Sequence, residues 1–123
     1  MPSSGTGIRV RRVYDPPEAG DGTRVLVDRL WPRGLAKERA AVDLWLKEVA
    51  PSTEVRTRYH QGLDDFAGFA AHYRAELAEP EREAAVRRLA GLARDSTVTL
   101  VTAVKDVEHS HVPVLVDRLE TRG

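Results

Sequence analysis

Two strand-like runs that lie far apart in the chain, with helical patterns between them, constrain the fold more than any other feature of this sequence. Residues 24–30 carry three consecutive apolar residues at their centre, Val25, Leu26 and Val27, as strands buried on both faces do. Residues 97–104 are rich in β-branched residues and predict a second strand. Strands separated by helices predict a three-layer α/β domain of the Rossmann-like or flavodoxin-like kind, with a small, mostly parallel sheet.

The segments between and after these two strands have apolar residues at spacings of three and four, which indicates helices with one buried face. We expect such helices over residues 65–77, 80–94 and 112–119. Pro113 is tolerated because it falls in the first turn of the last helix. Another helix is expected to begin near Ser52, whose hydroxyl can cap it, and a short helical turn is expected over residues 36–40.

The remaining segments give weaker patterns. Residues 8–14 suit a half-exposed strand, which could pair with residues 24–30 in an antiparallel manner. Residues 42–46 fit a strand and a helix equally well, and we interpret them as a strand. Residues 1–7 are small and polar and predict a flexible tail, which leaves residues 8–123 as a single domain. A chain of 123 residues has room for one core of ordinary size.

Charge and cysteine content exclude several function classes. The chain has 19 basic and 19 acidic residues, so it lacks the basic excess of proteins that bind nucleic acids or anionic membranes. The absence of cysteine excludes disulfides, thiolate catalysis and iron–sulfur clusters, and leaves histidine and carboxylate as the strongest metal ligands. No stretch approaches 18 apolar residues and the amino terminus lacks the apolar core of a signal peptide, so we expect a soluble cytoplasmic protein.

Polar clusters follow the two best strand predictions. Residues 28–34 offer a carboxylate, two arginines and a tryptophan, and residues 105–111 offer a lysine, two acids and two histidines. In open α/β sheets, ligands bind beyond the carboxyl ends of the strands. If the two strands are neighbours, both clusters line one cleft.

The first cluster indicates an anion site. Arg29 and Arg33 could hold a carboxylate or phosphate through paired hydrogen bonds, and Trp31 could stack on a planar ligand or cap the pocket. Lys47 could add positive charge. A structural alternative stays open, because an arginine at a strand end commonly pairs with a neighbouring acid such as Asp28 and a tryptophan usually belongs to the core.

The second cluster allows two chemistries. His109 and His111, together with Asp106 or Glu108, could hold a divalent metal such as iron, zinc or nickel, although two histidines alone do not make a site. Alternatively, His111 at the start of the last helix would be held neutral by the helix dipole and could act as a proton acceptor or hydrogen-bond donor. Asp28 or Asp106 would then share the proton transfer. A capping or structural histidine is the plain alternative for each histidine taken alone.

Nearly the whole chain after Gly7 resembles the YeaO-like proteins, a branch of the bacterial domain-of-unknown-function 488 family. The resemblance is carried by residues 9–15, 27–34, 44–47, 50–52, 73–77, 98–100 and 105–106, with Phe69 and His111. The string Val-Asp-Arg-Leu-Trp-Pro-Arg-Gly at residues 27–34 is its longest and most specific part. The resemblance implies a small cytoplasmic α/β domain with a Rossmann-like sheet and no agreed reaction.

The chain departs from the wider family at the second cluster. Members of that family have a cysteine-histidine-arginine stretch where Ser110, His111 and Val112 stand here, and often a cysteine near the position of Thr102. Both thiols and the arginine are absent from this chain. The resemblance therefore carries over His111 but no cysteine nucleophile.

Four functions are compatible with these patterns. The leading hypothesis is a cleft that binds a small anionic molecule through Arg29, Arg33 and Lys47, with His111 and an aspartate available for proton transfer. The alternatives are a divalent metal site at His109 and His111, a homodimeric interaction module that uses its tryptophans as anchors, and a nucleic-acid-associated regulator. The neutral total charge makes nucleic acid the least favoured partner. The chain could be an enzyme or a binding protein under the leading hypothesis.

Overall fold

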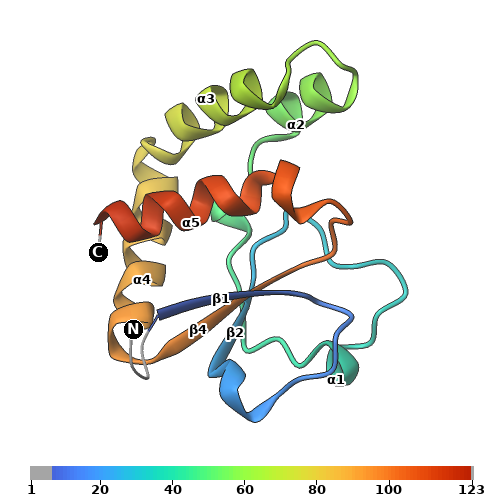
Figure 1. Cartoon of the computed structure of the whole chain (residues 1–123), viewed down its shortest axis with the longest axis vertical. Coiled ribbons are helices and arrows are strands. Elements are labelled where there is room, and N and C mark those ends of the chain that lie inside the picture. The colour runs from blue at the N-terminus through green and yellow to red at the C-terminus, as the bar shows by residue number, and fades with distance from the viewer. Residues whose placement is uncertain (1–6, 123) are drawn as a thin grey trace.

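A computed structural model describes residues 7–122 and confirms the α/β prediction (Figure 1). Four parallel strands form one sheet in the order β1-β4-β2-β3. The strands are β1 (Gly7–Arg12), β2 (Thr23–Leu26), β3 (Leu44–Trp45) and β4 (Thr97–Thr102). The predicted tail at residues 1–7 lies outside the described residues except for Gly7, which already belongs to β1.

Five α-helices accompany these strands in the described part of the chain. They are α1 (Lys37–Ala40), α2 (Thr53–His60), α3 (Phe66–Leu77), α4 (Pro80–Asp95) and α5 (His111–Arg122). Short 3-10 turns lie at η1 (Ala19–Asp21), η2 (Lys47–Val49) and η3 (Val107–His109). Between residues 7 and 122, no helix is long and apolar enough to cross a membrane.

Local capping explains why the helices begin where the sequence predicts. The Ser52 hydroxyl accepts a hydrogen bond from the backbone N–H of Val55 at 3.2 Å and caps α2. The Asp65 carboxylate accepts one from the N–H of Gly68 at 2.8 Å and caps α3. Pro80 occupies the first turn of α4, where its missing N–H is not needed.

The two faces of the sheet are covered differently. Alternation along the strands directs Val25, Val98 and Leu100 toward α3, α4 and α5, where they join the larger core. Leu26 and Val101 point to the opposite face and pack in a smaller core beneath α1 and the loops around it. The sheet therefore lies between a layer of long helices and a thinner layer of loops and one short helix, as Figure 1 shows.

The predicted antiparallel pairing of the first two strands is wrong. β4 lies between β1 and β2 and pairs with both in parallel, so that Val101 is in register with Arg11 on one side and Leu26 on the other. The ten residues between β1 and β2 are enough for the chain to return to the starting edge of the sheet, which lets β2 run in the same direction as β1. The β2 prediction was also too long, because the strand ends at Leu26.

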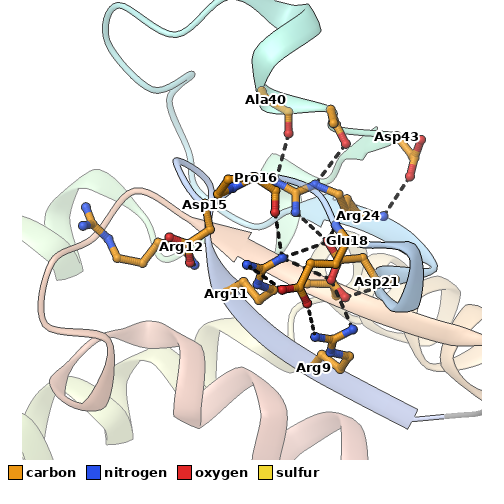
Figure 2. Close-up of polar contacts among 12 residues, drawn as sticks. Arg9, Arg11, Arg12, Asp15, Pro16, Glu18, Asp21, Arg24, Ala40 and Asp43 are labelled. Carbon is orange, nitrogen blue, oxygen red and sulfur yellow. Dashed lines mark hydrogen bonds and ion pairs between the residues drawn. The ribbon is translucent and has the colours of Figure 1, made fainter.

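An ionic cluster around a buried aspartate holds this return loop to the sheet (Figure 2). We call it the Asp21 cluster; its members are Arg9, Arg11, Glu18, Asp21 and Arg24. The Asp21 carboxylate is 2.8 Å from Arg24 and 3.2 Å from each of the other two arginines. Burial by itself raises the pKa of Asp21, but the hydrogen bonds from the Glu18 N–H and Arg24 and the charges of Arg11 and Arg24 hold this pKa below its usual value.

Candidate functional site

The two polar clusters predicted from the sequence meet at the carboxyl ends of β2 and β4. These strands are direct neighbours, with Leu26 in register with Val101, so the segments that follow them leave the sheet side by side. The convergence of Asp28 and His111 follows from this pairing. It is the position at which open α/β sheets bind ligands.

Asp28 connects three strands at this edge. Its carboxylate accepts hydrogen bonds from the Thr102 hydroxyl and from the backbone N–H of Ala103, both at 2.7 Å, which joins the end of β2 to the end of β4. Its carbonyl oxygen accepts a 2.7 Å bond from the indole N–H of Trp45 in β3. The side chain is only 13% exposed. Asp28 therefore fixes the floor of the site.

The environment of Asp28 favours its charged form. Burial alone raises the pKa of this carboxyl, but the hydrogen bonds from His111, Ala103 and Thr102 and the charge of His111 lower it further than burial raises it. The net effect is a pKa below the usual value for aspartate. Asp28 is thus an acceptor whose oxygen atoms already face three donors.

His111 is the first residue of α5 and is buried beside Asp28. Its Nε2 lies 3.0 Å from the carbonyl oxygen of Val27 and 3.4 Å from Oδ1 of Asp28. A carbonyl oxygen only accepts hydrogen bonds, so Nε2 carries a proton and donates it. In the neutral ring, Nδ1 is then the nitrogen without a proton. The ring also packs edge-on against Tyr73, with 6.0 Å between the ring centroids.

Two adjoining cavities open around His111. The first, which we call the cationic lobe, has a volume of about 360 Å³, and its walls include Asp28, Arg29, Trp31, Arg33, Arg56 and His111. The second, which we call the aromatic lobe, has a volume of about 440 Å³, and its walls include Arg56, Tyr59, Phe69, Asp106, His109 and His111. Both cavities share Pro51, Arg56, Val104 and His111, so the lobes are two parts of one cleft.

Three arginines line the cationic lobe, and the one acid in its wall, Asp28, forms no ion pair with them. Arg29 and Arg33 are exposed and Arg56 is half-buried, and no side-chain hydrogen bond or ion pair of the three is found between residues 7 and 122. The Nε atom of Arg56 is buried and has no hydrogen-bond partner within this part of the chain. Cations with unused donors at a cavity wall can hold a phosphate or carboxylate through charge-assisted hydrogen bonds.

Arg56 was missed in the sequence analysis. It stands on α2, one residue after the buried Val55, and belongs to neither of the two clusters that follow the strands. One sequence signal could have identified Arg56. A cation in the first half of a helix is unfavourable next to the positive end of the helix dipole, so an arginine there suggests a role other than stabilising the helix.

Two predicted ligand-binding residues are placed differently from the rest. Lys47 lines a separate cavity of about 390 Å³ that it shares with Arg29 and Glu48, and its ammonium group lies 4.9 Å from the centre of the Trp45 ring. Lys47 is therefore not brought into the cationic lobe. Trp31 lines that lobe but is also anchored, because its indole N–H donates to the carbonyl of Leu35 at 2.7 Å and its ring packs edge-on against Trp45.

The residues predicted to hold a metal are only partly assembled. Nδ1 of His109 lies 3.0 Å from the carboxylate of Asp106, and both side chains are exposed. His111 directs its Nε2 away from this pair, toward Val27 and Asp28. Within residues 7–122, no group of three or more histidines and acids could hold a metal ion. The structure brings together two candidate ligands, His109 and Asp106, and metal binding stays a prediction.

Comparison with known proteins gives a family but no reaction. A family model described as the inactive DUF488-N3 subclade matches residues 7–122. The uncharacterized protein YeaO of Escherichia coli is 46% identical over 114 residues, which cover 93% of this chain and 97% of that protein. An uncharacterized protein of Mycobacterium tuberculosis is 44% identical over 117 residues, covering 95% of this chain and 97% of the relative. No solved structure matches the chain.

Proposed function

This chain belongs to the inactive DUF488-N3 subclade, a family of YeaO-like proteins, and from that premise we propose that it binds a small anion, a phosphate or a carboxylate, in the cleft at the carboxyl ends of β2 and β4. The observation that carries this proposal is the group of three arginines, Arg29, Arg33 and Arg56, around one cavity, none of which forms an ion pair in the described part of the chain. Binding without catalysis agrees with the description of the subclade as inactive.

The alternative of acid–base catalysis receives less support from the geometry. His111 has one ring nitrogen free of a proton in its neutral form and lies in the wall of both lobes, which favours a role as a base. Asp28 is less suited to proton transfer, because its oxygens already accept from Thr102, Ala103 and His111. Asp106 is exposed and paired with His109. We therefore assign Asp28 to holding the strand ends together and His111 to the wall of the cleft.

Isothermal titration calorimetry with inorganic phosphate tests the proposal. We expect wild-type protein to bind phosphate and an Arg56→Gln or Arg33→Gln variant to bind it at least about tenfold more weakly, because a hydrogen bond to a charged group contributes about 1.5–3 kcal/mol. Arg88→Gln is the matched control, since Arg88 is exposed on α4 and lies outside the cleft. Acetate and sulfate titrations then show which anion class is preferred.

Two results would overturn the proposal. Absence of phosphate, sulfate and acetate binding at millimolar concentration would show that the free arginines do not form an anion site. Equal weakening by Arg88→Gln and Arg56→Gln would show that the anion responds to overall charge and not to the cleft. The homodimer and nucleic-acid alternatives stay predictions, and neither is needed to explain the cleft.

A further inference from the structure

We propose that the ligand of this cleft carries a planar ring as well as an anionic group, so that it is an aryl or heteroaryl phosphate or carboxylate, with the ring in the aromatic lobe and the anion in the cationic lobe. This inference rests on the proposed anion-binding function and adds the chemical class of the ligand. Its basis is that the two halves of one cleft have different walls.

The aromatic lobe presents a wall rich in aromatic rings that contact one another. The rings of Tyr59 and Phe69 are stacked, with centroids 4.5 Å apart and an angle of 16° between their planes. The Tyr59 hydroxyl donates to the carbonyl of His109 at 2.8 Å, which joins α2 to the loop before α5. The His109 ring in turn meets Phe66 edge-on at 5.7 Å. Aromatic walls of this kind favour planar, apolar ligand groups through stacked and edge-to-face contacts.

The aromatic lobe differs from the cationic lobe in its rings, because Tyr59 and Phe69 line only the aromatic lobe. Asp106 contributes a carboxylate, and Lys105 and Arg56 contribute cations, with Arg56 standing at the junction of the two lobes. Of the two lobes, only the cationic lobe is lined by Arg29 and Arg33, and Arg29 also borders the separate cavity of Lys47. One end of the cleft is thus suited to a charge and the other to a ring.

The size of the cleft also exceeds what a simple anion fills. Pockets for small ligands commonly measure about 300–1,000 Å³, and each lobe, at about 360 and 440 Å³, reaches that range by itself. The residues common to both lobes, Pro51, Arg56, Val104 and His111, lie where the lobes adjoin. A ligand that occupies both lobes would contact Arg56 with its anionic end and the Tyr59 side with its ring.

Calorimetry with three probes tests this inference: inorganic phosphate, phenyl phosphate and phenol. We expect phenyl phosphate to bind at least about tenfold more tightly than phosphate, because burial of the ring adds apolar contact, and we expect phenol to bind far more weakly than either. Tyr59→Leu should remove most of the difference between phenyl phosphate and phosphate. Tyr59→Phe is the matched control, because it keeps the ring and should keep the difference.

A spectroscopic measurement on wild-type protein keeps the test independent of variant folding. Nuclear magnetic resonance should show shifts of the Tyr59 and Phe69 ring protons with phenyl phosphate and little shift with phosphate. If phosphate binds and phenyl phosphate binds no more tightly, this inference fails and the anion site stands. If neither probe binds, the proposed function itself fails. Tighter binding of phenyl phosphate that is insensitive to Tyr59→Leu, with unshifted Tyr59 and Phe69 protons, would place the ring elsewhere and overturn the inference.

Discussion

Replacement of Asp28 by asparagine is the sharpest test of how the sheet edge is built. The substitution keeps the shape of the side chain and removes its charge. In the wild type, the carboxylate accepts from the Thr102 hydroxyl and the Ala103 N–H at 2.7 Å and lies 3.4 Å from Nε2 of His111. Asparagine has one oxygen and one NH2 group, so it cannot accept from all three donors.

The expected loss of stability in Asp28→Asn follows from the number of these donors that the asparagine can still satisfy. The asparagine oxygen can keep the Ala103 bond, and the Thr102 hydroxyl can turn to accept from the NH2 group. The N–H at Nε2 of His111 keeps its bond to the Val27 carbonyl but then faces a donor in place of a carboxylate. Loss of the carboxylate charge weakens the hydrogen bonds that it accepts, each of which contributes about 1.5–3 kcal/mol, so we expect the free energy of unfolding to fall by about 2–3 kcal/mol at pH 7. For a chain of this size, that corresponds to a decrease in Tm of about 6–15 °C.

Urea unfolding followed by the fluorescence of Trp31 and Trp45 measures this difference. Asp117→Asn is the matched control, because Asp117 is exposed on α5, and its stability should stay within about 0.5 kcal/mol of the wild type. The folded-state pKa of Asp28 is lowered, so the carboxylate stabilises the protein above its unfolded pKa of about 4 and loses this effect as the pH falls through the folded value.

The stability gap between the wild type and Asp28→Asn should therefore narrow below about pH 4. An Asp28→Asn variant as stable as the wild type at pH 7 would refute the assignment of Asp28 as the connection between β2 and β4. A stability gap that stays unchanged down to pH 3 would refute the electrostatic explanation.

Three further substitutions test other parts of the structure by the same urea assay. Asp21→Asn should lower stability by about 3 kcal/mol, because it leaves three arginines without their shared buried acid, and a loss below about 1 kcal/mol would contradict the role given to the Asp21 cluster. Gly22→Ala should be much more destabilising than Gly34→Ala: both glycines have positive φ, but a Cβ at Gly22 would lie 2.1 Å from the carbonyl oxygen of Thr97, whereas Gly34 has open space. Equal losses would contradict this close approach. Ser52→Ala should lower the free energy of unfolding by about 1 kcal/mol, because it removes the side-chain cap of α2, and Ser52→Asp should restore the cap and the lost stability.

The helices were predictable because their signals are local. The Ser52 and Asp65 caps and Pro80 act within one turn of the helix they start, so nearby sequence is enough to locate α2, α3 and α4. Strand direction depends on what lies between strands, and β4, which separates β1 from β2, comes more than 70 residues later in the chain. Nothing in residues 8–30 alone distinguishes a hairpin from two strands divided by a third.

The site was predictable only where it follows from the order of the strands. Asp28 and His111 meet because each follows a strand, and the order of those strands is the only tertiary fact required. The placement of Lys47 and Arg56 depends on where η2 and α2 lie. η2 packs against α4 and α2 packs against α3, both through contacts between segments apart in the sequence. This packing leaves Lys47 outside the cleft and brings Arg56 into its wall. No periodicity or spacing in the sequence encodes that placement.

The neutral total charge of the chain conceals a local imbalance, which is the strongest argument for a ligand in the cleft. At η1, the guanidinium groups of Arg9, Arg11 and Arg24 share one buried acid, Asp21, and Arg9 and Arg11 also pair with Glu18. At the carboxyl ends of the strands the corresponding acid is Asp28, but its oxygens accept from the protein's own hydroxyl, amide and imidazole groups. The arginines around the cationic lobe are left without an anion in the described part of the chain. A bound anion would complete there the arrangement that Asp21 completes in the loop between β1 and β2.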